Sequence, residues 1–234
     1  MAPGPRATVV LVHGAWHGPW CWELLRPYLE AEGLGVQCPA LPSAGPVPAD
    51  LAADASRVRE VLRRVSGPVV LCGHSYGGMV ISATDTERAD VRALVYLCAY
   101  MTAPGQSLET SLRDAGERRP GHWARPLPDG RCRVDARRAA DLFYHDCPDA
   151  TRNWAVTQLR PHWAGVLGEP IAMPAWQRHR CTYVQCTGDR ALDPRIQREI
   201  YAPRARQIVT LDSSHSPFLS QPRQLAQVLA ALAQ

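Results

Sequence analysis

The stretch VVLCGHSYGGMVI, residues 69–81, decides how the rest of the sequence is interpreted. Its first half, Val69 to Cys72, is a short apolar run typical of a strand buried on both faces of a sheet. A helix is expected from Tyr76 onward, so the pattern Gly-x-Ser-x-Gly, residues 73–77, falls between a strand and a helix. In that context glycines permit a sharp turn that exposes the serine Oγ at the helix N-terminus. The sequence therefore predicts that Ser75 is a nucleophile.

Apolar runs and helical stretches alternate on both sides of this turn. Strands are expected at 8–14, 36–42, 68–73, 91–100, 181–189 and 206–215, and helices at 21–33, 49–65, from 76, 194–201 and from 222. Such alternation is typical of a mainly parallel sheet flanked by helices. We therefore expect an α/β fold built as one domain over residues 1–234.

The alternation stops between about residues 101 and 178. This segment holds eight prolines and four of the seven tryptophans of the chain. We expect a small, partly helical lid there, inserted after the first half of the core and covering the carboxyl end of the sheet. The core is then formed by residues 1–100 and 179–234.

A nucleophilic serine needs a base, usually histidine, which a carboxylate orients. In folds built around this turn the acid and then the base follow the serine along the chain. Asp189 follows one predicted strand and His215 follows the next, so Ser75, Asp189 and His215 are the expected catalytic residues. Two alternatives for the acid are Asp193, which precedes Pro194 as a helix N-cap would, and Asp212, which is placed to brace the histidine loop.

Two backbone N–H groups are needed to stabilise the oxyanion of a tetrahedral intermediate. We expect one from Tyr76, directly after the nucleophile, and one from Ala15 in the loop HGAWHG, residues 13–18. His13 is expected to be structural. Four further histidines lie in or beside the lid and are expected on the surface or in packing, and none shows metal-ligand spacing: His122, His145, His162 and His179.

Charge and cysteine content exclude several function classes. The 26 basic residues are all arginine, against 22 acidic residues, so lysine-dependent catalysis and the P-loop lysine are absent. Arginines between 113 and 138 alternate with acids, which favours a solvated face over nucleic-acid binding. No signal sequence and no apolar run of about 18 residues is present, so we expect a cytoplasmic protein without membrane contact. The eight cysteines form no C-x-x-C pair and are expected to be reduced thiols.

At this point the chain resembles the α/β-hydrolases. More narrowly it resembles the small esterases grouped with plant methyl esterases, salicylate-binding esterase and hydroxynitrile lyases, and above all bacterial esterases of that group. The resemblance rests on residues 10–33, 73–81, 143–147, 186–199 and 211–222. It implies a cofactor-free serine esterase with Ser75, Asp189 and His215 as its triad. The loop between Leu41 and Leu51 is shorter than is usual in the group, so one wall of the substrate pocket is expected to differ.

The expected reaction is hydrolysis of a small, largely apolar or aromatic carboxylic ester or lactone through an acyl-enzyme. The expected substrate-binding residues lie in the first loop and in the lid: Gly14, Trp16, Trp123, Phe143 and Trp154. The tryptophans of the lid could equally hold it in place. The expected partner is a small-molecule ester, without nucleic acid or metal, and the protein is expected to be a monomer or a homodimer.

Two other functions stay open: non-hydrolytic chemistry on the same fold, such as a lyase or cyclase of secondary metabolism, and simple ligand binding. The resemblance bears on the lyase. In the related hydroxynitrile lyases a threonine follows the loop histidine and a lysine follows the catalytic histidine. Gly14 and Ser216 occupy those positions here. We therefore expect little or no hydroxynitrile lyase activity.

Overall fold

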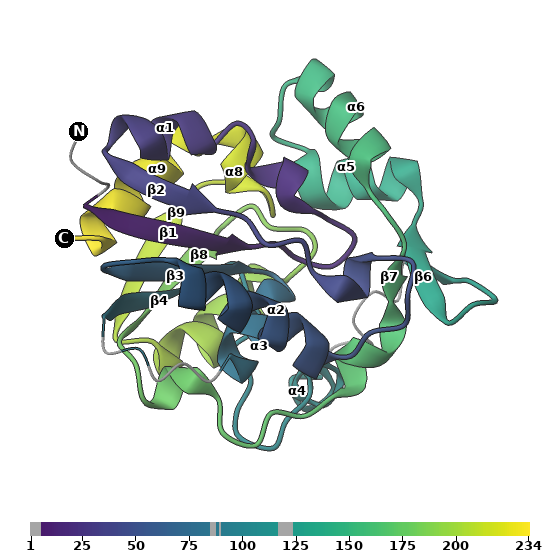
Figure 1. Ribbon diagram of the computed structural model, residues 1–234. Coiled ribbons are helices and arrows are strands. Elements are labelled where there is room, and N and C mark those ends of the chain that lie inside the picture. The colour runs from purple at the N-terminus through teal and green to yellow at the C-terminus, as the bar shows by residue number, and fades with distance from the viewer. Residues whose placement is uncertain (1–5, 85–87, 89, 117–123) are drawn as a thin grey trace.

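The computed structural model describes residues 6–84, 88, 90–116 and 124–234. Six strands form one sheet in the order β2-β1-β3-β4-β8-β9, and every neighbouring pair is parallel (Figure 1). Their bounds are Ala7–Val12 for β1, Leu34–Gln37 for β2, Val69–His74 for β3, Val91–Leu97 for β4, Cys181–Cys186 for β8 and Gln207–Leu211 for β9. The predicted α/β architecture with a parallel sheet is confirmed.

Helices pack on both faces of this sheet. Helix α1 (Arg26–Ala31) lies beside α9 (Pro222–Leu232), and α2 (Leu51–Arg64) lies beside α3 (Gly77–Ala83), so the two pairs cover opposite faces (Figure 1). Short helices complete the core: η1 (Pro19–Trp22), η2 (Pro42–Ala44), α7 (Pro194–Ile196), η5 (Gln197–Tyr201), η6 (Ala202–Arg204) and α8 (Pro217–Ser220). No helix in the described ranges is long and apolar enough to cross a membrane.

Some expected elements are shorter than the sequence predicts. The helix expected at 21–33 is divided into η1 and α1, and both pieces have a proline in their first turn. A proline at that position lacks the N–H that a preceding helical turn would need, so it begins a new helix instead of continuing the old one. The strand expected at 36–42 corresponds to β2, which begins at Leu34 and already ends at Gln37.

The insertion, residues 101–178, lies between β4 and β8. It contains α4 (Leu108–Asp114), α5 (Ala136–Tyr144), α6 (Asp149–Gln158), η3 (Ala164–Gly168) and η4 (Ala175–Gln177). It also contains a small antiparallel sheet of β5 (Ala124–Pro126), β6 (Arg131–Val134) and β7 (His162–Trp163), which the sequence analysis did not predict. These strands are two to four residues long, and β5 and β6 contain arginine, so they lack the apolar alternation that identifies a strand.

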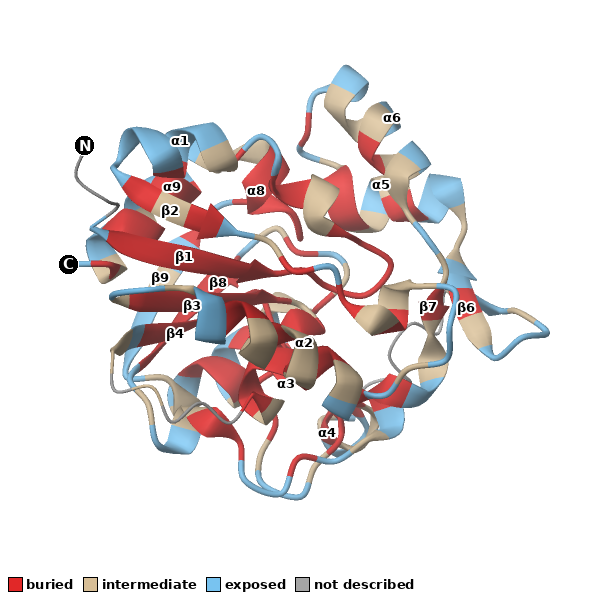
Figure 2. Cartoon of the chain, viewed as in Figure 1, coloured by how far each residue is buried: buried red, intermediate tan, exposed pale blue. Residues whose placement is uncertain are grey.

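The core lies along the middle of the large sheet. Strands β1, β3 and β8 are buried along their whole length, whereas the edge strand β9 is largely exposed (Figure 2). All eight cysteines are free thiols, and seven of them are buried. The continuous apolar runs of the sequence therefore correspond to strands covered on both faces, as expected for a parallel sheet.

The turn between β3 and α3 is packed against β1 without spare room. A Cβ placed on Gly77 would overlap the carbonyl oxygen of Val12 and would lie 2.9 Å from that of His13. Real Cβ atoms do not approach backbone oxygens so closely. Helix α3 can therefore begin this close to β1 only because residue 77 has no side chain.

We expect Gly77→Ala to destabilise the fold by about 1–3 kcal/mol, because the added methyl must push α3 away from β1. Urea unfolding followed by circular dichroism measures the loss. Gly165→Ala is the matched control, since Gly165 is exposed, has no positive φ, and a Cβ placed on it would have no atom within 4 Å. Equal stability of the two variants would contradict this account of the turn.

Candidate active site

The residues expected to be catalytic follow the carboxyl ends of four different strands. Ala15 follows β1, Ser75 follows β3, Asp189 follows β8 and His215 follows β9. Because these strands are parallel, their carboxyl ends meet at one edge of the sheet. The fold therefore brings these loops, which are separated by up to 200 residues in the chain, to one place.

Ser75 occupies a strained turn. Its φ is 53°, in the left-handed region that residues with a side chain rarely adopt. Its backbone is held by β4 and the residues after it: the Ser75 N–H donates to the carbonyl of Leu97 and the Tyr100 N–H donates to that of Ser75, both at 3.2 Å. Such strain costs about 1–3 kcal/mol and persists where the surrounding structure enforces it.

His215 is oriented by Asp189. The Nδ1 atom of His215 lies 2.7 Å from Oδ2 of Asp189, and both side chains are buried. The carboxylate also accepts from the N–H groups of Ala191 and Leu192 at 2.8 and 2.9 Å and from Nε2 of Gln197 at 2.9 Å. A carboxylate only accepts, so Nδ1 of His215 carries hydrogen, and in the neutral imidazole Nε2 is the nitrogen that accepts.

The two alternative acids lie elsewhere. Asp193 caps α7 by accepting from the N–H of Arg195 at 2.7 Å. Asp212 accepts from the hydroxyl of Thr187 at 3.1 Å. Neither contact involves His215, so the geometry favours Asp189 as the acid.

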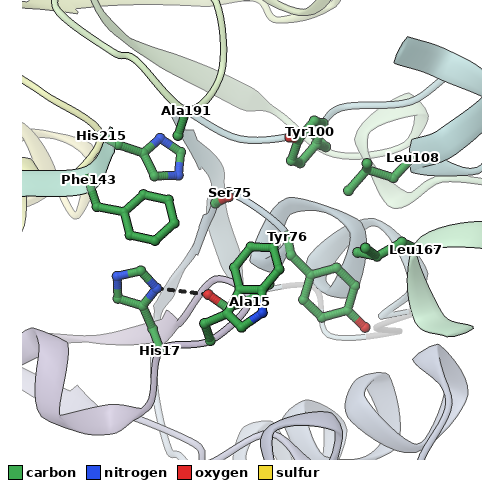
Figure 3. A pocket seen from close by; sticks show the side chains of 11 residues that line it. Ala15, His17, Ser75, Tyr76, Tyr100, Leu108, Phe143, Leu167, Ala191 and His215 are labelled. Carbon is green, nitrogen blue, oxygen red and sulfur yellow. Dashed lines mark hydrogen bonds between the residues drawn. The ribbon is translucent and has the colours of Figure 1, made fainter. Parts of the chain in front are cut away.

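Ala15 and Tyr76 line the same pocket as Ser75. Among the described residues, neither of their backbone N–H groups donates a hydrogen bond to the protein. The peptide of Ala15 is held by His17, whose Nδ1–H donates to the Ala15 carbonyl at 2.9 Å (Figure 3). His17 is held in turn by the hydroxyl of Tyr144, which donates to its Nε2 at 2.8 Å. An oxyanion hole requires two N–H donors without other partners, so Ala15 and Tyr76 remain the candidates for it.

The pocket around Ser75 encloses about 390 Å³, including its open mouth, and none of the described residues that line it is acidic or an arginine. Figure 3 shows Ser75 and His215 on its wall together with aromatic and aliphatic side chains. The lining residues are Ala15, Trp16, His17, Ser75, Tyr76, Tyr100, Leu108, Phe143, Leu167, Ala191 and His215. Such a site is suited to an uncharged, largely apolar ligand.

Of the five residues expected to bind substrate, two line this pocket. Trp16 and Phe143 do so, and their rings stack with centroids 6.3 Å apart. Trp154 does not, because on α6 its ring packs edge-on against Trp20 at 5.4 Å. Gly14 also lies outside the lining: a Cβ there would lie 2.9 Å from both Nδ1 of His74 and Cβ of Ser75. Trp123 lies outside the described residues.

The residues that hold the acid and base loops were not among those expected from the sequence. Gln197 is fully buried, and its Nε2 donates both to Asp189 and to the carbonyl of Leu192. On the insertion, Nε2 of His145 donates to the carbonyl of Gly188 at 2.8 Å, and Asp146 accepts from the N–H of Ser214 at 2.8 Å. A polar residue inside a helix gives no sequence signal for such a role, since most face solvent.

One group of described residues brings three possible metal-ligand atoms within 4.8 Å of one another: His74, Cys98 and His215. Burial raises the pKa of the Cys98 thiol well above its ordinary value, so it remains protonated. The thiol and Nε2–H of His74 both donate to the carbonyl of His215, at 3.4 and 2.8 Å. These contacts account for the group as a set of hydrogen bonds within the protein.

Several histidines of the core are buried and uncharged. Burial lowers the pKa of His13 to about 4 and the pKa values of His17 and His162 to about 3. Burial also holds the pKa of His74 well below its ordinary value. The unfolded chain exposes all four side chains to water, where an imidazole titrates near pH 6.5.

The free energy of unfolding is therefore expected to fall as the pH drops below about 6.5, because the unfolded chain then binds protons that the folded chain does not. Each of these histidines lowers the free energy of unfolding by up to about 1.4 kcal/mol for every unit by which the pH falls, until the pH reaches the pKa of that histidine in the folded protein. Calorimetry near pH 5.5 in two buffers of different ionisation enthalpy counts the protons taken up on unfolding. We expect at least about two; a count of zero would show that these histidines are not buried in the neutral form.

Comparisons with known proteins identify the family and agree with the fold. The model of the alpha/beta hydrolase family matches residues 9–228. A pyrethroid hydrolase of Sphingobium wenxiniae is 29% identical over 244 residues, covering 96% of this chain and 87% of that protein. Methylesterase 18 of Arabidopsis thaliana is 28% identical over 249 residues, covering 94% of both chains.

A solved structure shows the same fold. The crystal structure of a pyrethroid hydrolase from Sphingobium faniae JZ-2 superposes with a TM-score of 0.83 at 28% identity, covering 97% of each chain. The resemblance to plant methylesterases expected from the sequence is also confirmed. The chain belongs to the alpha/beta hydrolase family.

Proposed function

We propose that this protein is a serine hydrolase that cleaves a small, uncharged carboxylic ester or lactone through an acyl-enzyme. The observation that carries the proposal is the pocket in which Ser75 lies with His215, whose Nδ1 is 2.7 Å from Oδ2 of Asp189. Relatives named as a pyrethroid hydrolase, methylesterases and a carbendazim hydrolyzing esterase support the reaction class.

In the proposed mechanism, Nε2 of His215 takes the proton of Ser75 as Oγ attacks the carbonyl carbon. Asp189 holds the ring in the tautomer that leaves Nε2 free and stabilises the imidazolium that forms. The N–H groups of Ala15 and Tyr76 donate to the oxyanion. His215 then gives its proton to the departing alcohol, and a water activated by the same nitrogen hydrolyses the acyl-enzyme.

The pocket lining supports an uncharged acyl group. Aromatic walls from Trp16, Tyr100 and Phe143 and the aliphatic side chains of Leu108 and Leu167 offer apolar contact. Among the residues that the structure describes, no arginine lines the pocket to bind a carboxylate or phosphate, and the two lining histidines are the proposed base and the neutral His17. Binding an anion there would remove its hydration without replacing it.

A lyase on the same fold is not favoured. At the position of the lysine in the related lyases, the hydroxyl of Ser216 is fully buried and has no partner among the described residues. A cation 4 Å from a departing cyanide would supply about 4 kcal/mol at an effective dielectric near 20. A neutral hydroxyl does not replace that charge.

We expect Ser75→Ala and His215→Ala each to lower kcat for p-nitrophenyl acetate by about 10³-fold or more, and the double variant to be little worse than either. The two side chains act as one unit, so removing the second costs little. Steady-state kinetics on freshly folded protein measures these changes in kcat. A separate assay with mandelonitrile measures any lyase activity.

Two matched variants control for nonspecific damage. Ser66→Ala changes an exposed serine before the amino end of β3, and Asp193→Asn changes the acid that caps α7. Both should retain the wild-type rate, whereas Asp189→Asn should lose a large part of it. Additive losses at Ser75 and His215, or release of benzaldehyde from mandelonitrile faster than ester turnover, would contradict the proposal.

A further inference from the structure

A buried polar cluster lies on the side of Tyr76 away from the pocket. It joins Ser43 of η2, Asp54 of α2, Tyr76 of the catalytic turn and His162 of β7. The first two and His162 are fully buried, and Tyr76 is 1% exposed. Oγ of Ser43 lies 2.5 Å from Oδ2 of Asp54 and 3.0 Å from Nε2 of His162. The hydroxyl of Tyr76 donates to the same Oδ2 at 2.8 Å.

These contacts require one proton more than a carboxylate and a neutral imidazole provide. Nδ1 of His162 lies 3.1 Å from the carbonyl oxygen of Trp163, which only accepts, so Nδ1 carries hydrogen. Ser43 contacts both Asp54 and His162, but its single hydroxyl hydrogen serves only one of these contacts. The other contact needs a proton on the carboxyl of Asp54 or on Nε2 of His162.

With that proton the cluster has no net charge, and without it a negative charge is buried. No arginine of the described ranges contacts Asp54, and the chain has no lysine. The other ionisable groups that face the cluster do not compensate it: Asp50 and Glu169 beside the start of α2 are acidic, and His13 is neutral. An unpaired buried carboxylate is costly, so the neutral form is favoured.

Burial decides where the proton resides. It raises the pKa of Asp54, although hydrogen bonds from Ser43 and Tyr76 oppose the rise. It lowers the pKa of His162 to about 3. Of the two groups, the carboxyl of Asp54 is therefore the favoured site for the extra proton, and the imidazole of His162 is neutral.

We propose that Asp54 is a positioning residue of the oxyanion hole: its protonated carboxyl group is the centre of an uncharged hydrogen-bond chain from the insertion to Tyr76. Asp54 donates to Ser43, Ser43 donates to His162, and Tyr76 donates to Asp54. The inference rests on the proposed function, in which the Tyr76 N–H binds the oxyanion.

The hydrogen-bond chain holds Tyr76 by the hydroxyl group at the end of its side chain. Figure 3 shows the Tyr76 ring on the pocket wall with its hydroxyl directed away from Ser75. The ring of His162 packs edge-on against it at 5.1 Å. Holding the hydroxyl limits rotation of the ring and movement of the backbone N–H next to Ser75. Because β7 belongs to the insertion, the same contacts couple the seating of the insertion to the catalytic turn.

The charge of the cluster is tested without any activity assay. Asp54→Asn mimics the protonated acid, since its amide N–H can donate to Ser43. In the unfolded chain an aspartate loses its proton near pH 4, so above that pH folding of the wild type takes up a proton that folding of the variant does not. The folding constant of the wild type relative to the variant should fall by up to about tenfold per pH unit until the cluster itself titrates.

Urea unfolding of both proteins at several values between pH 5 and 8 measures this ratio. Residues that titrate identically in the two proteins, such as the buried histidines outside the cluster, cancel from it. A ratio that does not change with pH would show that Asp54 is an ordinary carboxylate and would overturn the proposal.

The positioning role is tested by kinetics with p-nitrophenyl acetate. Tyr76→Phe removes only the hydroxyl, and Asp54→Leu removes the carboxyl group at the centre of the hydrogen-bond chain. Each should lower kcat by about tenfold or more with KM changed by less than about threefold, because misplacing an oxyanion donor affects the transition state. Asp54→Asn should recover most of the rate, and Asp50→Asn, on the same helix, is the matched control.

The two measurements separate the possible failures. Lower stability of the folded variants with unchanged kcat would reduce the cluster to a structural role and overturn the positioning claim. Absence of ester turnover in the wild type would contradict the proposed function and, with it, the role at the oxyanion hole. In that case the pH dependence of unfolding would still decide whether Asp54 is protonated.

Discussion

The edge of the sheet that carries Ser75 depends on the close packing of one turn. Ser75 has a left-handed φ of 53° because β3 must end and α3 must begin within two residues while α3 stays against the carbonyls of β1. Two other described residues with side chains have positive φ, Trp16 after β1 and Cys98 after β4. All three follow carboxyl ends of central strands, so the strain is concentrated where the proposed chemistry occurs.

The site combines this strained backbone with a nearly uncharged interior. His17 and His74 are neutral donors that fix the Ala15 carbonyl and the His215 carbonyl. If the inference about Asp54 holds, even the buried carboxyl next to Tyr76 is uncharged. Asp189 differs from it in its partners, since it accepts from four donors: the N–H groups of Ala191 and Leu192, Nε2 of Gln197 and Nδ1 of His215.

Much of this arrangement could be predicted from the sequence because it is encoded locally. The apolar run at Val69–Cys72 and the glycines around Ser75 identify the turn, and Asp189 and His215 each lie in the loop that follows a recognisable strand. The small sheet of the insertion could not be predicted, since β7 has only two residues. Trp154 was expected at the pocket, but the sequence does not reveal which face of α6 packs against Trp20.

The Asp54 cluster also escaped prediction, for a different reason. Ser43 and His162 are 119 positions apart, and neither lies in a recognisable motif. Their proximity depends on how the insertion folds back over the loop after β2. Only coordinates reveal that a serine, a histidine and a carboxyl share hydrogen bonds there, and the proton count follows from those distances.

The central claim is that Ser75 is an activated nucleophile. Incubation with a fluorophosphonate and intact-protein mass spectrometry tests it most directly, since the reagent requires an activated hydroxyl and no knowledge of the substrate. The account predicts one adduct per chain, mapped to the peptide that contains Ser75 and absent in Ser75→Ala and His215→Ala. A folded wild-type protein that remains unlabelled, or a label on another residue, would contradict it.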